Sequence, residues 1–389
     1  MTLGAANDSA GTRVNDVAID SARTVSVQAT QFEINGEMIA TNVFGSVLFS
    51  GDIEAQRFLV EAQGGITVAG SLSATDGNIQ LTSGSVIEIA GQLDSSTSIN
   101  RFVALEAISI VLRNADTSTA GGDISLTGSV LVGGDLNLNT SANPSIFDAG
   151  RILIGGSIES LIAGEGVLNF NTEVNLQNSS IVISDSIGEV SRLRSATFRT
   201  SSLTVGGVNL DSGDLRIDAL GTFAFGSLIA INGSIDVSGS FVLRNPNLAV
   251  EASEIIFQNA VTGSSGNESF NLVATESLVF KNRVGQFANL TVTAGDSISF
   301  DGPVTLSGNL VANGNNPTQV SSSTIQTTGI QQYNGGVSFL RDGVLIASEV
   351  SLGEQTLVAN NVLYNVNSTV IGDSLRKITG TLPVQPRFF

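Results

Sequence analysis

A strict alternation of side chains over residues 124–139, ISLTGSVLVGGDLNLN, places the strongest constraint on the fold of this chain. Every second residue from Ile124 to Leu138 is apolar or glycine, and the residues between them are mostly Ser, Thr, Asp and Asn. Successive side chains of a β-strand point to opposite faces, so this period of two predicts strands with one buried face. Glycine takes every third inward position, Gly128 and Gly134, which indicates bends at regular intervals.

The same phrase, apolar-x-apolar-x-Gly-x-apolar, returns along most of the chain. Its copies are Ile66/Val68/Gly70/Leu72, Ile87/Ile89/Gly91/Leu93, Ile152/Ile154/Gly156/Ile158, Ile229/Ile231/Gly233/Ile235 and Val304/Leu306/Gly308/Leu310. The first two copies begin at Ile66 and Ile87, and looser short strands, among them 255–257, 278–280 and 298–300, lie between copies. A recurring unit of this length is typical of repeat architectures, in which each unit covers the apolar edge of the next.

Two all-β architectures use short strands of this kind. An antiparallel sandwich or barrel joins strands of about five or six residues through hairpin turns. A parallel β-helix winds one coil in roughly 20 residues and stacks its coils about 4.8 Å apart. Glycine fixed between inward positions, few Asn-Gly or Asp-Gly hairpin signals and a charged fraction of only 13% favour the β-helix. Like charges at stacked positions would repel, whereas ladders of Ser, Thr and Asn can hydrogen-bond.

We therefore predict an all-β parallel β-helix (β-solenoid) of about 18 coils, each of roughly 20 to 22 residues. Helix signals are weak, and the best helical stretch, Asn100–Arg113, is equally compatible with a strand, a bend and a second strand. Three segments are expected: N-terminal coils or a cap over 1–59, the regular β-helix over 60–315, and a C-terminal segment over 316–389. The last segment is expected to hold irregular coils with a terminal extension, or further coils of drifted sequence.

The ionisable residues exclude several classes of site. The chain of 389 residues has no cysteine and no histidine, so it can form neither a disulfide nor a zinc site of Cys or His ligands. Its formal net charge of −18 opposes binding to nucleic acid and to anionic membrane surfaces. The uncharged run 219–235 is interrupted by Gly, Ser, Thr and Asn, so no membrane span is expected there.

The phrases GGDISLTGSVLVGGDLNLNTSA, AGDSISFDGPVTLSGNLVANG and GGITVAGSLSATDGNIQLTSGSVIEIAG resemble the repeats of filamentous haemagglutinin-like exoproteins and autotransporter passenger domains. The resemblance covers roughly residues 60–315. It implies a single-stranded, right-handed parallel β-helix, export to the cell surface, and a role in adhesion or as a stalk. The first residues, MTLGAANDSAGTR, lack the basic start and apolar core of a signal peptide, so an exported chain is expected to be a piece of a larger precursor.

The sequence DSGDLRID, residues 211–218, is the candidate for a catalytic or metal site. Asp214, Arg216 and Asp218 would point the same way along one strand, and Asp211 precedes them. Carboxylates in such a groove could hold Ca²⁺ or supply a general acid and base. The alternative is a solvated strand face, and no resident cofactor is expected.

Other polar features have simpler interpretations. The triplets Gly121-Gly122-Asp123 and Gly133-Gly134-Asp135 lack the rest of a calcium-binding repeat, so we expect them to be turns with an Asp side chain. Polar inserts near 94–100, 114–121 and 262–269 are where a binding module would display loops from a passive scaffold.

The expected function is that of a non-enzymatic, extracellular structural or adhesive β-solenoid, as a surface rod, stalk or filament subunit. Its partners would be further copies joined end to end through strand edges, neighbouring segments of a larger exoprotein, or a glycan or other cell-surface ligand. The alternative is an exported β-helix that binds or cleaves polysaccharide, with Asp214, Arg216 and Asp218 in an exposed groove.

Overall fold

The computed structural model describes residues 2–4, 12–20, 23–141, 150–173, 179–224, 226–245, 247–322, 324–353, 357–358 and 362–371. The chain divides into two compact units, each described by itself below. Unit 1 comprises Met1–Asp211 and Asp218–Leu220, and unit 2 comprises Ser212–Ile217 and Gly221–Phe389. The three segments expected from the sequence, 1–59, 60–315 and 316–389, do not coincide with these two units. They remain predictions.

The described residues form strands and no helix, so no helix among them could span a membrane. The strands of unit 1 are β1 (Thr2–Gly4), β2 (Thr12–Val14), β3 (Val17–Asp20), β4 (Val25–Ile34), β5 (Glu37–Val43), β6 (Val47–Ala55), β7 (Arg57–Ala62), β8 (Ile66–Val68), β9 (Leu72–Ala74), β10 (Ile79–Ser83), β11 (Val86–Ile89), β12 (Gln92–Ile99), β13 (Val103–Arg113), β14 (Asp116–Ala120), β15 (Ile124–Gly133), β16 (Asp135–Asn139), β17 (Arg151–Ile154), β18 (Ile158–Ser160), β19 (Val167–Glu173), β20 (Ser180–Ile187) and β21 (Ser195–Leu210). β22 (Leu215–Ala224) has residues in both units.

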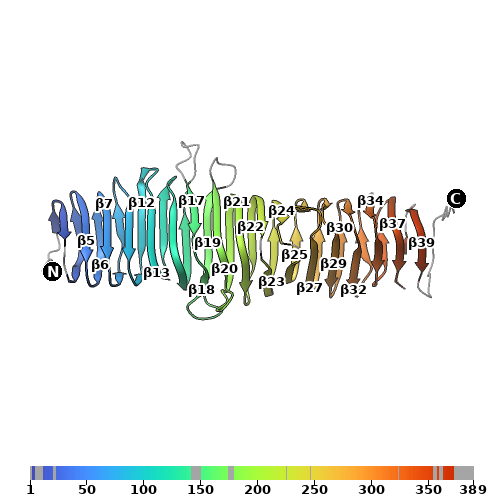
Figure 1. Cartoon of the computed structure of the whole chain (residues 1–389), viewed down its shortest axis with the longest axis horizontal. Coiled ribbons are helices and arrows are strands. Elements are labelled where there is room, and N and C mark those ends of the chain that lie inside the picture. Colours follow the sequence, from blue (N-terminus) through green and yellow to red (C-terminus); the bar gives the residue numbers. More distant parts are fainter. Residues whose placement is uncertain are drawn as a thin grey trace. The chain divides into compact units, whose positions relative to one another are not determined.

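Unit 2 continues in the same manner. Its strands are β23 (Leu228–Val237), β24 (Ser240–Leu243), β25 (Asn247–Phe257), β26 (Val261–Gly263), β27 (Ser269–Phe280), β28 (Val284–Gly285), β29 (Asn289–Ala294), β30 (Ser297–Phe300), β31 (Val304–Leu306), β32 (Leu310–Gly314), β33 (Thr318–Val320), β34 (Thr324–Thr327), β35 (Ile330–Tyr333), β36 (Val337–Phe339), β37 (Gly343–Leu352), β38 (Leu357–Val358) and β39 (Val362–Ile371). Within each unit the strands follow one another as the sides of successive coils (Figure 1).

Equivalent residues of successive coils lie side by side in parallel pairs. In unit 1 Val25 pairs with Val47, Val47 with Ile66, and Ile66 with Ile87. Each of these pairs is one coil apart in the sequence, a step close to the predicted coil length. The parallel β-solenoid predicted from the alternation is therefore confirmed.

The number of coils differs from the expectation. The structure has about 15 turns, where the sequence predicted about 18. Some coils are longer than the predicted length of roughly 20 to 22 residues. The pairing of Val130 with Ile158, and of Ile158 with Ile187, shows two such coils.

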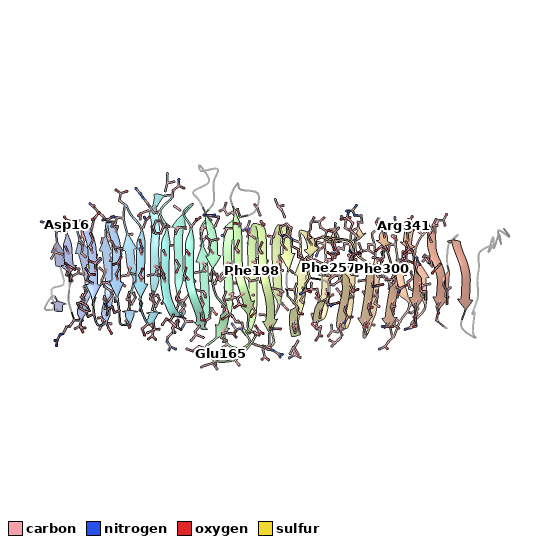
Figure 2. The ribbon with its side chains drawn as sticks, viewed as in Figure 1. Asp16, Glu165, Phe198, Phe257, Phe300 and Arg341 are labelled. Carbon is pink, nitrogen blue, oxygen red and sulfur yellow. The ribbon has the colours of Figure 1, made fainter. Side chains whose placement is uncertain are left out.

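The alternation in residues 124–139 sorts side chains as predicted. Its Ile, Leu and Val residues at even-numbered positions are all buried, whereas Leu131 and Asn137 face outward and are only partly covered. The same sorting holds in unit 2, where Phe257 and Phe300 lie inside the coils and Arg341 lies outside (Figure 2). The apolar side chains of each coil therefore fill its interior, which is the main source of stability in this fold.

Phenylalanine forms a stack inside unit 2. Phe257 pairs with Phe280, and Phe280 with Phe300, so the three rings lie at the same position of successive coils. Neighbouring ring centroids are 5.4 and 5.3 Å apart, with interplanar angles of 9° and 2°. Parallel register alone produces this alignment, because it repeats each side chain one coil further on.

The segment with helical character is a bent strand. Residues Val103–Arg113 form β13, whose register against β15 shifts between Glu106 and Ser109. Ile108 lies at this shift and is 74% exposed. The interpretation as strand, bend and strand is therefore confirmed, and the helical alternative is wrong.

Glycine is required at one corner because the coils approach each other closely there. A Cβ added to Gly70 would lie 2.1 Å from the carbonyl oxygen of Gly51, and one added to Gly91 would lie 2.0 Å from that of Gly70. Both glycines occupy the predicted position of the repeated phrase. The sequence predicted a bend without a Cβ clash, and the structure shows that the clash would be with the backbone of the preceding coil.

Replacing Gly156 by alanine is expected to lower the free energy of unfolding by about 1–3 kcal/mol. Its new Cβ would lie 2.5 Å from the Gly128 carbonyl oxygen and 2.8 Å from the carbonyl carbon, and neither atom can move without shifting the coil. Gly155 is a matched control, since a Cβ there meets no atom closer than 3.7 Å. Chemical denaturation of both variants checks this, and equal losses at the two positions would contradict the explanation.

Candidate functional site

The charged residues of DSGDLRID can each be located by their exposure and contacts. Asp214 and Arg216 are exposed and Asp218 is half-exposed, so the predicted outward direction is confirmed. Asp214 belongs to unit 2, where its Oδ1 accepts a hydrogen bond of 2.8 Å from the Ser234 backbone N–H. Asp218 belongs to unit 1, where its Oδ2 lies 3.9 Å from Nε of Arg199.

The remaining aspartate of that sequence, Asp211, lies in unit 1 and is exposed. Its backbone N–H donates a 2.8 Å hydrogen bond to the Leu193 carbonyl oxygen. Across the part of the chain that the structure describes, no three Asp or Glu side chains come together as a metal site. The contacts seen for these aspartates are those of residues that tie one coil to the next.

The two GGD triplets also join coils through their aspartates. Asp123 accepts hydrogen bonds from Arg151, at 2.8 Å from the backbone N–H and 2.7 Å from a terminal guanidinium nitrogen. The hydrogen bond and the negative charge of Asp123 raise the pKa of Arg151. Asp135 lies 3.9 Å from the guanidinium of Arg194. Each triplet therefore places an ion pair at the surface, of a kind that contributes little stability by itself.

A side-chain hydrogen bond ties one polar insert to the neighbouring coil, and another closes the turn that follows a second insert. In the insert near 94–100, the Thr97 hydroxyl donates to the carbonyl oxygens of Ala74 and Thr75, at 2.8 and 2.9 Å. In the insert near 114–121, Thr119 is buried and its hydroxyl donates to the Gly122 carbonyl oxygen at 2.5 Å. These two inserts are therefore built into the coils.

The third insert, 262–269, closes around a buried carboxylate. Glu268 is 3% exposed, and its Oε1 accepts hydrogen bonds from the backbone N–H groups of Ser264 and Ser265, at 3.0 and 2.7 Å, and from the Ser264 hydroxyl at 2.8 Å. Its Oε2 accepts from the Gly266 N–H at 2.9 Å. Burial, the largest single influence, raises the pKa of Glu268, but the hydrogen bonds outweigh it and lower the pKa to about 2. Glu268 therefore stays ionised and fixes the shape of this loop.

One outer face of unit 1 carries a regular array of polar side chains, which we call the polar grid. It has two columns that run across β12, β14, β16, β19 and β21. The first column is Gln92, Asp116, Asn137, Asn169 and Thr197, and the second is Asp94, Ser118, Asn139, Asn171 and Arg199. None of the ten side chains is buried. Parallel register thus brings together five pairs of polar groups from strands that lie far apart in the sequence.

The columns of the polar grid are hydrogen-bonded from coil to coil. In the first column the Asn137 amide donates to Asp116 at 2.5 Å, and the Asn169 amide donates to Asn137 at 2.9 Å. In the second column the Ser118 hydroxyl donates to Asp94 at 2.9 Å. The predicted ladders of Ser and Asn are therefore confirmed, and each bond fixes the orientation of the side chain that makes it.

The polar grid was not among the sites predicted from the sequence, although a repeated motif marks it. The motif LNLNT at 136–140 returns as LNFNT at 168–172. A coil longer than the usual repeat separates the two outward asparagines of the first copy from those of the second. This additional length hides the repeat from a search at one fixed period.

The comparisons give no family for this chain. It matches no protein-family model, no curated protein and no solved structure. The assignment of a function therefore depends on the fold and on the groups exposed on its faces.

Proposed function

We propose that this chain is a non-enzymatic structural and adhesive β-solenoid of the bacterial cell surface, of the kind found in filamentous haemagglutinin-like exoproteins and autotransporter passenger domains. The observation that carries the proposal is the bonding of each coil to the next, both on the outside and in the interior. The resemblance of residues 60–315 to those exoproteins supports export and display at the surface.

Bonding between coils suits a protein that must resist pulling or shear. The polar grid joins five coils on one face of unit 1, and the stack of Phe257, Phe280 and Phe300 joins coils inside unit 2. In addition, parallel backbone pairing joins coil to coil within each unit. Stability in such an array is a sum over neighbouring coils, so the same construction can be extended to any length.

Strand edges supply a means of assembly. Among the described strands, β3 pairs with β5 on one edge and with no other described strand on the second edge, where a further strand could be added. An edge of this kind can pair with a strand of a second copy or of a neighbouring segment of a larger exoprotein. A head-to-tail contact of this type does not close on itself, and it therefore produces filaments.

Electron microscopy over a range of protein concentrations tests the assembly. Long fibres of uniform width are expected, and their number should rise with concentration. Val17→Pro and Ala18→Pro, at adjacent positions of β3, each remove one backbone N–H, and alternate residues of a parallel strand direct this group to opposite edges. The variant that removes the N–H directed at β5 should be less stable. The variant that removes the N–H on the opposite edge should stay folded and form no fibres.

Asn15→Ala, in the exposed bend before β3, is the control and should leave the fibres unchanged. Single particles at every concentration, or fibres that survive both proline substitutions, would overturn the assembly through this edge.

A further inference from the structure

The amide groups of the polar grid have hydrogen-bonding capacity that the ladder does not use. An asparagine side chain offers two N–H donors and two acceptor sites on its oxygen. Asn137 uses one donor to Asp116 and one acceptor site for Asn169. It therefore keeps one N–H and one acceptor site for a partner outside the protein. Asn169 uses one donor to Asn137, and among the described residues its Oδ1 has no hydrogen-bond donor.

The second column repeats this arrangement two residues further along each strand. Asn171 donates from its amide to Asn139 at 3.1 Å, and the Oδ1 atoms of Asn139 and Asn171 accept from the backbone N–H groups of Ser141 and Glu173. The amide of Asn139 and the second N–H of Asn171 are therefore the donors that this pair presents outward. Because these bonds fix the side chains before a ligand arrives, binding would cost little conformational entropy.

The spacing of the polar grid defines the shape of its ligand. Neighbouring coils are about 4.8 Å apart along each column, and the two columns are about 6.6 Å apart along the strands. A ligand that engages successive coils must itself carry donors and acceptors at a short, regular interval. An extended chain of sugar rings has this property, since every ring carries hydroxyl groups that both donate and accept.

The charge of the polar grid selects among such polymers. Seven of its ten side chains are uncharged, and the remaining three are Asp94, Asp116 and Arg199. The two aspartates are held by hydrogen bonds within the columns. With a chain net charge of −18, an anionic polysaccharide would be repelled, whereas a neutral one would not.

We propose that the polar grid is a binding site for an extended, uncharged glycan, which lies along the columns and hydrogen-bonds to the outward groups of Asn137, Asn139, Asn169 and Asn171. The site rests on the adhesive part of the proposed function and names its ligand class. It contains no catalytic residue, and the bound chain is held without cleavage.

Sedimentation with suspended cellulose and with suspended chitin tests the proposal on the full chain. The protein should pellet with at least one of these neutral glycans and should not be retained by a gel that contains polygalacturonate, an anionic one. The double variant Asn169→Val, Asn171→Val keeps residues that suit a strand but removes the amides. Its affinity should fall about tenfold or more, since several hydrogen bonds are lost.

The matched control is Asn259→Val, Asn282→Val, which removes an exposed pair of amides in unit 2 that are 3.5 Å apart and lie outside the polar grid. This control should bind as the unchanged protein does. Asn137→Val, Asn139→Val provides a second test of the grid if the first variant melts at a lower temperature.

Three results would overturn the proposal: no sedimentation of the unchanged protein with either glycan, retention by polygalacturonate alone, or equal losses in the grid and control variants. The outcome is separable from that of the assembly test. Fibres without glycan binding would overturn the glycan site alone, and glycan binding without fibres would overturn the end-to-end assembly alone.

Discussion

Replacing Phe280 by alanine should lower the free energy of unfolding by about 3–5 kcal/mol, the largest effect that we expect from any single substitution in the interior. The Phe280 ring is 1% exposed and lies between the rings of Phe257 and Phe300. Its removal loses the transfer free energy of the ring and leaves a cavity that two fixed neighbours cannot fill. Chemical denaturation followed by circular dichroism measures the loss.

Hydrogen exchange locates the same effect within the chain. Amides of β25, β27 and β30, the strands that carry the three rings, should exchange faster in the variant, because repeat proteins open locally around a weakened coil. Phe44→Ala is the control: Phe44 is 59% exposed, and its loss should change the stability by about 0.5 kcal/mol or less. A similar loss in both variants would show that the ring stack contributes nothing beyond the other contacts of the coil.

The sequence predicted the parts of the fold that depend on local pattern. Alternation fixes which residues face inward, so the burial of Ile124, Leu126 and Val130 follows from their spacing alone. The glycine of each phrase was also predictable as a bend. What it touches was not, because the carbonyl oxygen of Gly70 reaches the position of Gly91 only through the stacking of coils.

Residues 330–333, IQQY, show where local pattern fails. Alternation would direct Ile330 inward, yet Ile330 is 39% exposed while Gln331 and Tyr333 are fully buried. The register with the preceding coil decides the outcome, since Gln331 pairs with Leu310. The polar side chain is satisfied inside: its Nε2 donates to the carbonyl oxygens of Ile325 and Ile346 at 3.1 and 2.9 Å, and its Oε1 accepts from the Tyr333 hydroxyl at 3.2 Å.

The candidate site shows the same limit on prediction. Sequence proximity suggested that Asp214 and Asp218 act together, but it did not predict that Asp214 would accept a hydrogen bond from the Ser234 N–H or that Asp218 would lie near Arg199. The polar grid instead joins residues from five coils, and an insertion changes the repeat length between Asn137 and Asn169. A fixed period cannot find residues that a variable coil length brings into register.

Replacing Glu268 by glutamine should lower the free energy of unfolding at neutral pH by about 3 kcal/mol, and this loss should depend on pH. Glutamine presents N–H groups where one carboxylate oxygen now accepts, so the Gly266 N–H and the Ser264 and Ser265 donors cannot all be satisfied. Glu276→Gln is the matched control, because Glu276 is exposed on the same unit. It should be close to neutral.

The pH dependence follows from the pKa of Glu268, which folding lowers from 4.5 to about 2. The native state holds the ionised carboxylate more strongly than the unfolded chain does, so its contribution is fully present above pH 4.5. It is lost as the pH falls from 4.5 through 2, where the carboxyl becomes protonated in the folded protein as well. The stabilities of the unchanged protein and of Glu268→Gln should therefore converge in that interval. A constant difference between pH 7 and pH 2 would show that the glutamine acts through its shape and not through the charge that the loop 264–268 encloses.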